Sequence, residues 1–302
     1  MIASNNSAIV VAPPDERAPA HRLGEALGLE TSILELASFP DGETKIRAPA
    51  AAETTLLYWS LDQPNKKIMP LVLAASALRD IGAKRIILIA PYLCYMRQDK
   101  AFREGEPVSQ RVLARILSQW VDHLITVEPH IHRAPDLTSI FDKIDATNVS
   151  AAPLLSSLIE DDGANANAAL IGPDAESFAW TETVAAQSGL PFAVMSKVRL
   201  GDHKVDISYD DKLSVEGKKI YLIDDLISSG GTLLTAAALL RERAAAQIEA
   251  LVVHALCDAS MLDALESRGV DRIRSLDTAP HPTNARYIAP LLAETVRSEI
   301  KL

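Results

Sequence analysis

The chain is poor in cysteine, in positive charge and in long apolar runs, and each shortage excludes a class of protein. The two cysteines, Cys94 and Cys257, lie within apolar runs without metal-ligand spacing, which predicts buried free thiols in a reducing compartment. The sequence has no apolar stretch as long as a membrane span. Residues 1–11 lack the basic start and the long apolar core of a signal peptide. We therefore expect a cytoplasmic protein that does not bind a membrane.

Positive charge is in deficit, because 30 Lys and Arg residues stand against 40 Asp and Glu residues, for a net charge of -10 and an isoelectric point near 5.2. Broad nucleic-acid binding needs a basic surface, so we expect no nucleic-acid partner. An anionic ligand must instead meet positive charge at one local site. The 48% hydrophobic and 23% charged content is typical of a soluble globular protein, and 302 residues suffice for two domains with separate cores.

A short apolar strand, a loop of small residues and a helix are predicted in succession after the turn at residues 216–218. Residues 220–223 are apolar strand formers, and residues 233–243 are rich in Ala and Leu, with Thr232 as the expected helix cap. The loop between them, residues 228–232, contains two glycines that let backbone N–H groups approach an anion at the helix N-terminus. We call residues 228–232 the phosphate cradle.

The phosphate cradle lacks the lysine of a Walker loop, and two carboxylates, Asp224 and Asp225, stand at the end of the preceding strand. These acids would repel a bare polyphosphate, so they are expected to hold hydroxyl groups or a metal ion. A sugar phosphate fits both halves of the segment. The alternative is an ordinary strand, turn and helix with exposed acids.

The whole segment resembles the phosphoribosyl-pyrophosphate signature of the phosphoribosyltransferase-like fold. That signature consists of a hydrophobic strand, Asp-Asp, two residues, a small residue or Asp, Ser or Thr, and Gly-Gly-Thr. Phosphoribosyltransferases and ribose-phosphate pyrophosphokinases share it. The resemblance implies a ribose 5-phosphate site made of Asp224, Asp225, Ser228, Ser229, Gly230, Gly231 and Thr232.

Two further segments distinguish between these families. Phe39-Pro40-Asp41-Gly42-Glu43 resembles the Phe-x-Asp-Gly-Glu motif of ribose-phosphate pyrophosphokinases, and residues 91–99 resemble their Pro-Tyr-x-x-Tyr-x-Arg-Gln-Asp segment. A surface turn and a salt-bridged loop are the alternatives. Ordinary phosphoribosyltransferases have no use for either motif. The resemblance implies an aromatic ring stacked on adenine, acids at the edge of the base, and polar groups at the phosphates: Phe39, Asp41, Gly42, Glu43, Arg97, Gln98 and Asp99.

The same resemblance implies a metal site and a catalytic cation pair. His130 matches the family's acid-x-His position and Asp174 its Pro-Asp position, where together they serve Mg²⁺, whereas His132 is expected to be structural. Lys197 and Arg199 alternate along an extended segment, so both point to one side, and a charged edge strand is the alternative. In the family, a Lys-x-Arg pair begins a mobile loop over the transferred phosphates.

Alternating strands and helices predict an α/β fold with mostly parallel sheets. By resemblance, the chain has two tandem phosphoribosyltransferase-like domains, each a mostly parallel sheet flanked by helices, and the similarity of the halves suggests an internal duplication. Residues 1–149 with a C-terminal helix at 285–302 would form the ATP side, and residues 150–284 the ribose 5-phosphate side. Predicted strands include residues 7–11, 31–39, 56–59, 85–90, 123–127, 168–171, 192–195 and 250–255, the last of these being a last sheet strand of the second domain. Residues 273–278 resemble the strand that leads into the family's terminal segment.

The resemblance implies a ribose-phosphate diphosphokinase that moves the diphosphoryl group of Mg·ATP to the C1 hydroxyl of ribose 5-phosphate. Its partners would be ATP, ribose 5-phosphate and further copies of the chain in a dimer-based homo-oligomer, of which a hexamer is one form. Two alternatives stay open. One is a phosphoribosyltransferase, and the other is a catalytically silent regulatory partner of the same family.

Overall fold

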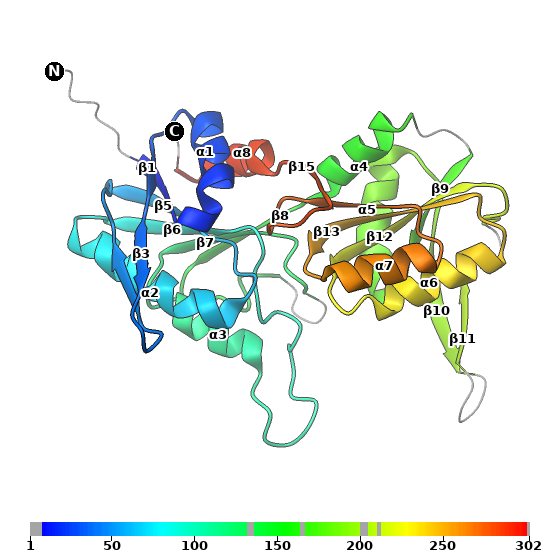
Figure 1. Ribbon diagram of the computed structural model, residues 1–302, viewed down its shortest axis with the longest axis horizontal. Helices are drawn as coiled ribbons and strands as arrows, with labels where there is room; N and C mark the ends of the chain where they lie inside the picture. The colour runs from blue at the N-terminus through cyan, green and yellow to red at the C-terminus, as the bar shows by residue number, and fades with distance from the viewer. Residues whose placement is uncertain (1–7, 132–135, 164–166, 200–204, 210–212, 301–302) are drawn as a thin grey trace. The chain divides into compact units, whose positions relative to one another are not determined.

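The computed structural model describes residues 8–131, 136–163, 167–199, 205–209 and 213–300, with the backbone alone for 197–199 and 205–209 (Figure 1). The chain divides into two compact units. Unit 1 consists of the chain up to Val149 and the segment from Ile288, and unit 2 runs from Ser150 to Tyr287. Each unit has a sheet of its own, so each is described by itself.

Unit 1 is built on a six-stranded parallel sheet in the order β2-β1-β5-β6-β7-β8. The central strands are almost continuously aliphatic, which suits strands that are covered by helices on both faces. The strands are β1 (Ala8–Ala12), β2 (Thr31–Ile33), β5 (Thr54–Tyr58), β6 (Arg85–Ala90), β7 (His123–Val127) and β8 (Asp145–Val149). The helices are α1 (Arg17–Leu27), α2 (Pro64–Asp80), α3 (Ser109–Leu117) and α8 (Ala289–Ile300), with a 3₁₀ turn η1 at Pro14–Glu16.

The single strand expected over residues 31–39 is wrong. The backbone N–H of Leu34 still bonds to Ala12, and its side chain is buried in the core of unit 1. The chain then leaves the main sheet, and β3 (Glu35–Ser38) pairs antiparallel with β4 (Thr44–Arg47) in a separate two-stranded sheet. The buried Leu34 therefore marks the point where one apparent strand becomes two.

Unit 2 contains a seven-stranded sheet in the order β11-β10-β9-β12-β13-β14-β15, parallel except for the β10–β11 pair. The expectation that residues 250–255 form its last sheet strand is wrong, because β14 and β15 follow, and β14 overlaps the strand expected at residues 273–278. The strands are β9 (Ala168–Gly172), β10 (Phe192–Arg199), β11 (Val205–Tyr209), β12 (Lys219–Ile227), β13 (Gln247–Ala255), β14 (Arg272–Leu276) and β15 (Asn284–Arg286). The helices are α4 (Ala152–Asp161), α5 (Phe178–Ser188), α6 (Gly231–Glu242) and α7 (Ala259–Ser267), with a 3₁₀ turn η2 at Ala175–Ser177.

The two sheets share one strand order. When β11 is left out, both run second, first, third, fourth, fifth and sixth in chain order. The order reverses between β1 and β5 in unit 1, and between β9 and β12 in unit 2. Open α/β sheets bind ligands at the carboxyl ends of the strands flanking such a reversal, which is called a switch point. Each unit has one switch point, where a ligand site is expected.

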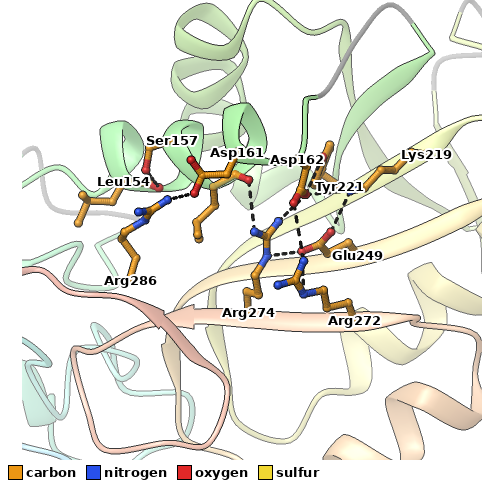
Figure 2. A network of polar contacts seen from close by, with 11 residues as sticks. Leu154, Ser157, Asp161, Asp162, Lys219, Tyr221, Glu249, Arg272, Arg274 and Arg286 are labelled. Carbon is orange, nitrogen blue, oxygen red and sulfur yellow. Dashed lines mark hydrogen bonds and ion pairs between the residues drawn. The ribbon is translucent and has the colours of Figure 1, made fainter.

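A network of charged side chains joins α4 to the amino ends of the unit 2 strands (Figure 2). Asp162 Oδ2 accepts hydrogen bonds from Lys219 Nζ at 2.8 Å, Tyr221 Oη at 2.9 Å and Arg274 Nη2 at 2.6 Å. Fully buried Glu249 pairs with Arg274 and with Lys219. Burial alone would raise the pKa of Asp162, but the bonds from Lys219 and Tyr221 and the charge of Arg274 lower that pKa to about 2. The network links the amino ends of β12, β13 and β14, whereas the switch point lies at the carboxyl ends of the strands.

The cysteine prediction is confirmed for Cys94, which is a buried free thiol, whereas Cys257 is a free thiol that is only partly buried. Burial raises the pKa of Cys94 to about 12, so this side chain stays protonated. Among the helices in the described ranges, none is both long and apolar enough to cross a bilayer.

Candidate functional site

The phosphate cradle lies at the switch point of unit 2, between the end of β12 and the start of α6. Gly230 adopts the left-handed conformation with φ of 64°, and the helix begins at Gly231. The predicted Thr232 cap is therefore wrong, because Thr232 lies inside the first turn, and no side chain of the described residues caps the helix. The first helical bond runs from Leu234 N–H to Gly230 O at 2.8 Å, so the N–H groups of residues 231–233 precede the helical ladder.

Gly231 leaves the mouth of the phosphate cradle open. A Cβ atom added to this residue would meet no described heavy atom within 4 Å beyond the local backbone. Gly172, at the end of β9, is the opposite case, since its Cβ would lie 2.2 Å from Ser177 Oγ and 2.7 Å from Thr181 Oγ1. One glycine permits close packing within the protein, and the other leaves space beside the helix N-terminus.

Three carboxylates gather beside the phosphate cradle. Asp224 Oδ1 accepts a hydrogen bond from the N–H of Asp225 at 3.0 Å. Burial of Asp224, followed by the charges of Asp225 and Asp174, raises the pKa of Asp224 well above its ordinary value. A ligand hydroxyl or a cation at this position would relieve the repulsion. The fold thus brings Asp174, which follows β9, near the Asp224–Asp225 pair, whereas the sequence resemblance assigned Asp174 to the metal with His130 and the pair to the ribose.

Asp174 also has a structural task that sequence reasoning missed. Its Oδ1 accepts hydrogen bonds from the N–H groups of Glu176 at 3.0 Å and Ser177 at 3.3 Å, which caps η2. The signal was present as an Asp followed two and three residues later by Glu and Ser ahead of a helix. The described residues contain no group of three His, Cys, Asp or Glu side chains placed to hold a metal ion.

The Phe39–Glu43 motif forms the tip of the β3–β4 hairpin in unit 1. Phe39 N–H bonds to Glu43 O at 2.8 Å, Gly42 N–H bonds to Phe39 O at 2.9 Å, and Gly42 has φ of 92°. Asp41 Oδ1 accepts from Glu43 N–H at 3.1 Å. Phe39 is 50% exposed, so the hairpin tip presents an aromatic side chain to a partner.

The Arg97-Gln98-Asp99 motif follows β6 and leads into a long loop before α3. Arg97 is exposed, whereas Gln98 Oε1 accepts a hydrogen bond from Ser109 Oγ at the start of α3. Farther along the loop, Glu106 Oε2 accepts from the N–H groups of Phe102 at 2.9 Å and Arg103 at 3.2 Å. Phe102, in the same loop, is 61% exposed.

The remaining predicted residues are distributed over both units. His130 is half-buried after β7 in unit 1, and Asp174 belongs to unit 2, so their joint metal site stays a prediction. His132 lies outside the described residues. The backbones of Lys197 and Arg199 belong to β10 and pair with Ile207 and Val205 of β11, while their side chains lie outside the description.

The switch point of unit 1 holds a buried lysine that sequence reasoning did not identify. Lys67 Nζ, on α2, donates to Asp62 Oδ1 at 2.5 Å, Ser60 O at 3.0 Å and Glu16 Oε1 at 3.4 Å. Burial raises the pKa of Glu16 to about 7 despite the nearby lysine. Burial would lower the pKa of Lys67, but its bond to Asp62 and the surrounding acids raise it. An internal ion pair therefore fills this position.

Both units are similar to domains of known proteins. A model of the N-terminal domain of ribose phosphate pyrophosphokinase matches residues 9–120, and a phosphoribosyl transferase domain model matches residues 141–282. The chain is 35% identical to a ribose-phosphate pyrophosphokinase of Methanopyrus kandleri, over 96% of this chain and 99% of the relative. It is 30% identical to ribose-phosphate pyrophosphokinase 2 of Archaeoglobus fulgidus, over 95% and 99% of the two chains.

A solved structure shows the same architecture. The phosphoribosylpyrophosphate synthetase from Mycobacterium smegmatis superposes with a TM-score of 0.84 at 26% identity, covering 98% of this chain and 99% of that one. The predicted fold class, two tandem phosphoribosyltransferase-like domains with mostly parallel sheets flanked by helices, is confirmed by this match and by the order of the strands.

Proposed function

The chain belongs to the ribose-phosphate pyrophosphokinase family and is an enzyme of that family, and from this premise we propose which reaction it carries out and with which residues. The reaction is transfer of the diphosphoryl group of Mg·ATP to the C1 hydroxyl of ribose 5-phosphate, giving 5-phosphoribosyl 1-pyrophosphate and AMP. The enzyme acts in the cytoplasm as a dimer-based homo-oligomer, without nucleic-acid or membrane partners.

The open phosphate cradle beside the three carboxylates is the observation that carries this proposal. The N–H groups of residues 231–233 precede the helical ladder and meet the 5-phosphate of the substrate, favoured by the positive end of the helix dipole. Asp224 and Asp225 accept hydrogen bonds from the ribose hydroxyls. This arrangement leaves the C1 hydroxyl free to act as nucleophile, and it compensates the burial and the carboxylate charges that raise the pKa of Asp224.

ATP binds through the two motifs of unit 1. The exposed ring of Phe39 stacks on adenine, and Asp41 and Glu43 contact the edge of the base. Arg97 meets the phosphates, with Gln98 and Asp99 beside it. The hydrogen bond from Ser109 to Gln98 supports a fixed orientation of that amide, whose NH₂ group then faces the nucleotide.

The metal would be Mg²⁺, for which His130 and Asp174 are the proposed protein ligands. Oxygen donors suit this hard cation, and because Asp174 Oδ1 caps η2, Oδ2 is the atom that would bind the metal. When bound, Mg²⁺ would neutralise charge on the polyphosphate. Replacing His130 with Ala should then move the Mg²⁺ titration of activity to higher concentration, and an unchanged titration would remove His130 from the metal site.

Lys197 and Arg199 stabilise charge on the transferred phosphates. Diphosphoryl transfer needs little covalent chemistry from the protein, so positioning and positive charge supply most of the rate enhancement. The ribose C1 oxygen attacks the β-phosphorus, the bond from the β-phosphorus to the α,β-bridging oxygen breaks, and AMP leaves with that oxygen. The proton of the C1 hydroxyl is released to solvent as the new oxygen–phosphorus bond forms.

The reaction is tested by incubating the purified protein with Mg²⁺, ribose 5-phosphate and ATP labelled at the β-phosphorus. The label should appear in phosphoribosyl pyrophosphate, with one AMP released for each product. Label transfer without ribose 5-phosphate, or no turnover at all, would contradict the proposal, and absence of turnover would favour a silent regulatory partner. Formation of a nucleotide from a free base would instead indicate a phosphoribosyltransferase.

The ribose site is tested separately by Gly231→Val. Because the new side chain would meet no described protein atom near its Cβ, the variant should fold as the parent does while filling the phosphate cradle. The KM for ribose 5-phosphate should rise by about a hundredfold or more, and the KM for ATP should change far less. Equal changes in both KM values would indicate general damage to the fold.

A further inference from the structure

The side chain of Met261, on α7, lies directly against Gly230 of the phosphate cradle. A Cβ atom built on Gly230 would stand 2.2 Å from Met261 Sδ, 3.1 Å from Cγ and 3.3 Å from Cε. The thioether thus occupies the space that a side chain at residue 230 would need. Gly230 is also the residue at which the loop turns into α6, in the left-handed conformation. The contact therefore lies at Gly230, where the phosphate cradle turns into α6.

The start of α7 is fixed by polar contacts on both sides. Asp258 caps the helix, and its Oδ1 accepts from the N–H of Met261 at 3.1 Å. The preceding carbonyl, of Cys257, accepts from His281 Nε2 at 3.0 Å. His281 Nδ1 accepts from the N–H of Thr283 at 3.3 Å, so the proton of a neutral ring lies on Nε2. Met261 consequently projects from an anchored helix end.

The segment that leads from β13 into α7, residues 256–261, contacts the residue just before the phosphate cradle and Gly230 within it. At one end, the N–H of Leu256 bonds to Ile227 O at 2.9 Å, immediately before Ser228. At the other end stands Met261, and α6 and α7 lie side by side (Figure 1). An unbranched, polarizable thioether adapts well to an irregular backbone surface. Glycine, by contrast, needs outside support to hold one conformation, because it adopts many at little cost.

We propose that Met261 is a positioning residue for the phosphate cradle, whose thioether holds Gly230 in the conformation that aims the first N–H groups of α6 at the 5-phosphate. This assignment rests on the proposed function, in which the phosphate cradle binds ribose 5-phosphate. Without the thioether, the free cradle samples other conformations, and substrate binding has to order it again. The loss therefore falls on ribose 5-phosphate affinity and spares ATP.

Met261→Ala tests this proposal, with Met261→Leu as the matched control. Met261 is only partly buried and Ala favours helices, so the Ala variant should fold. We expect its KM for ribose 5-phosphate to rise about tenfold, while kcat and the KM for ATP stay within about twofold of the parent. The Leu variant, of similar volume, should stay near the parental value. An unchanged KM for ribose 5-phosphate, or equal increases for both substrates, would overturn the proposal.

The Gly231→Val variant separates the two levels of inference. If Gly231→Val raises the KM for ribose 5-phosphate and Met261→Ala does not, the phosphate cradle binds the substrate and Met261 has no positioning role. If neither variant changes that KM, the proposed ribose site and the role of Met261 both fail.

A double-mutant cycle provides a second, independent measurement. Gly230→Ala places a methyl group against the thioether in the parent, whereas the Met261→Ala background leaves room for it. Equilibrium binding of ribose 5-phosphate should therefore weaken more when Gly230→Ala is made in the parent than when it is made in Met261→Ala. Equal weakening in the two backgrounds would show that the residues act independently, contrary to the proposal.

Discussion

In both units a 3₁₀ turn follows the first strand of the sheet, and a residue in the left-handed conformation precedes the helix after the third. The turns are Pro14–Glu16 in unit 1 and Ala175–Ser177 in unit 2. The left-handed residues are Gln63, with φ of 53°, and Gly230, with φ of 64°. Together with the common strand order, these features support an internal duplication. The two switch points therefore differ chiefly in the side chains placed on one backbone plan.

The fourth residue of the following helix illustrates this difference. In α2 it is Lys67, whose ammonium group binds Asp62 and the carbonyl of Ser60, whereas in α6 it is Leu234, which packs on the core. In unit 1 a positive charge inside the protein compensates the acids. In unit 2 the charges that act on Asp224 are those of two other carboxylates. The site of unit 1 is closed by its own chain, whereas the carboxylates at the site of unit 2 act on one another.

The largest predicted effect concerns Lys197, for which we propose a role on the substrate, in contrast to Lys67, which pairs with acids of the protein. Lys197→Ala should lower kcat by about two to four orders of magnitude, with much less effect on ATP affinity, because the cation stabilises charge that develops in the transition state. Arg199→Ala should behave similarly. Steady-state kinetics paired with equilibrium ATP binding measures both quantities. Near-parental turnover in Lys197→Ala would remove this residue from the mechanism.

Lys67→Met should produce the converse result. The free energy of unfolding should fall by about 3–5 kcal/mol, because Asp62 and Glu16 lose their buried cation, while the KM for ribose 5-phosphate stays parental. Urea denaturation and steady-state kinetics give the two values. The matched control is Lys66→Met, whose exposed side chain bonds to Gln63 and should contribute less than about 0.5 kcal/mol. A stable Lys67→Met protein would show that the switch point of unit 1 is not held by an ion pair.

The pH dependence of stability sharpens the description of the closed site. The pKa of Glu16 is raised from 4.5 to about 7, chiefly by burial, so this carboxyl loses its proton at a lower pH in the unfolded chain than in the folded one. Its contribution to stability is fully present below about pH 4.5 and is lost as the pH rises through 7. Glu16→Gln should remove this dependence, about 1–3 kcal/mol in the difference between parent and variant. Denaturant midpoints measured from pH 4.5 to 8 test it, and parallel curves for the two proteins would contradict it.

The smallest predicted effect is at the left-handed residue of unit 1. Gln63→Gly should stabilise the protein by about 0.5–1 kcal/mol, because glycine adopts a positive φ without the steric cost that a side chain carries. The kinetic constants for ribose 5-phosphate should not change. A thermal unfolding curve detects the shift, and a destabilised variant would indicate that the Gln63 side chain does more than its bond to Lys66.

Sequence reasoning succeeded where one short segment decided the structure. β6 (Arg85–Ala90) and β7 (His123–Val127) have the predicted bounds, because continuous apolar runs in buried parallel strands leave little ambiguity. The strand β8 (Asp145–Val149) was missed, since its Asp, Thr and Asn residues suit an edge position and carry a weak signal. Thr232 was misassigned as a helix cap, because a left-handed glycine can start the helix without a side-chain cap.

The closed site of unit 1 was beyond such reasoning for a physical reason. Lys67 and Glu16 are 51 positions apart in the sequence, and they meet because β1 and β5 lie side by side in the sheet of unit 1. A local pattern cannot distinguish a buried lysine from an exposed one when its partners arrive from another loop. The motifs for nucleotide and sugar phosphate were readable because each keeps its functional groups within a few residues.

β10 changes partners partway along its length, and this has a mechanical consequence. Residues 192–194 pair with β9 inside the sheet, whereas Met195 to Arg199 pair with β11. Lys197 and Arg199 therefore lie on a two-stranded extension of the sheet, which is fixed at residues 192–194 by the pairing with β9. With about 3.3 Å per residue, Arg199 lies about 17 Å along the strand from Val194. A bend of about 10° at Val194 would move the backbone of Arg199 about 3 Å sideways. The same bend would move the backbone of Lys197, about 10 Å from Val194, by about 2 Å, so a small rotation displaces both residues while the pairing of residues 192–194 with β9 stays intact.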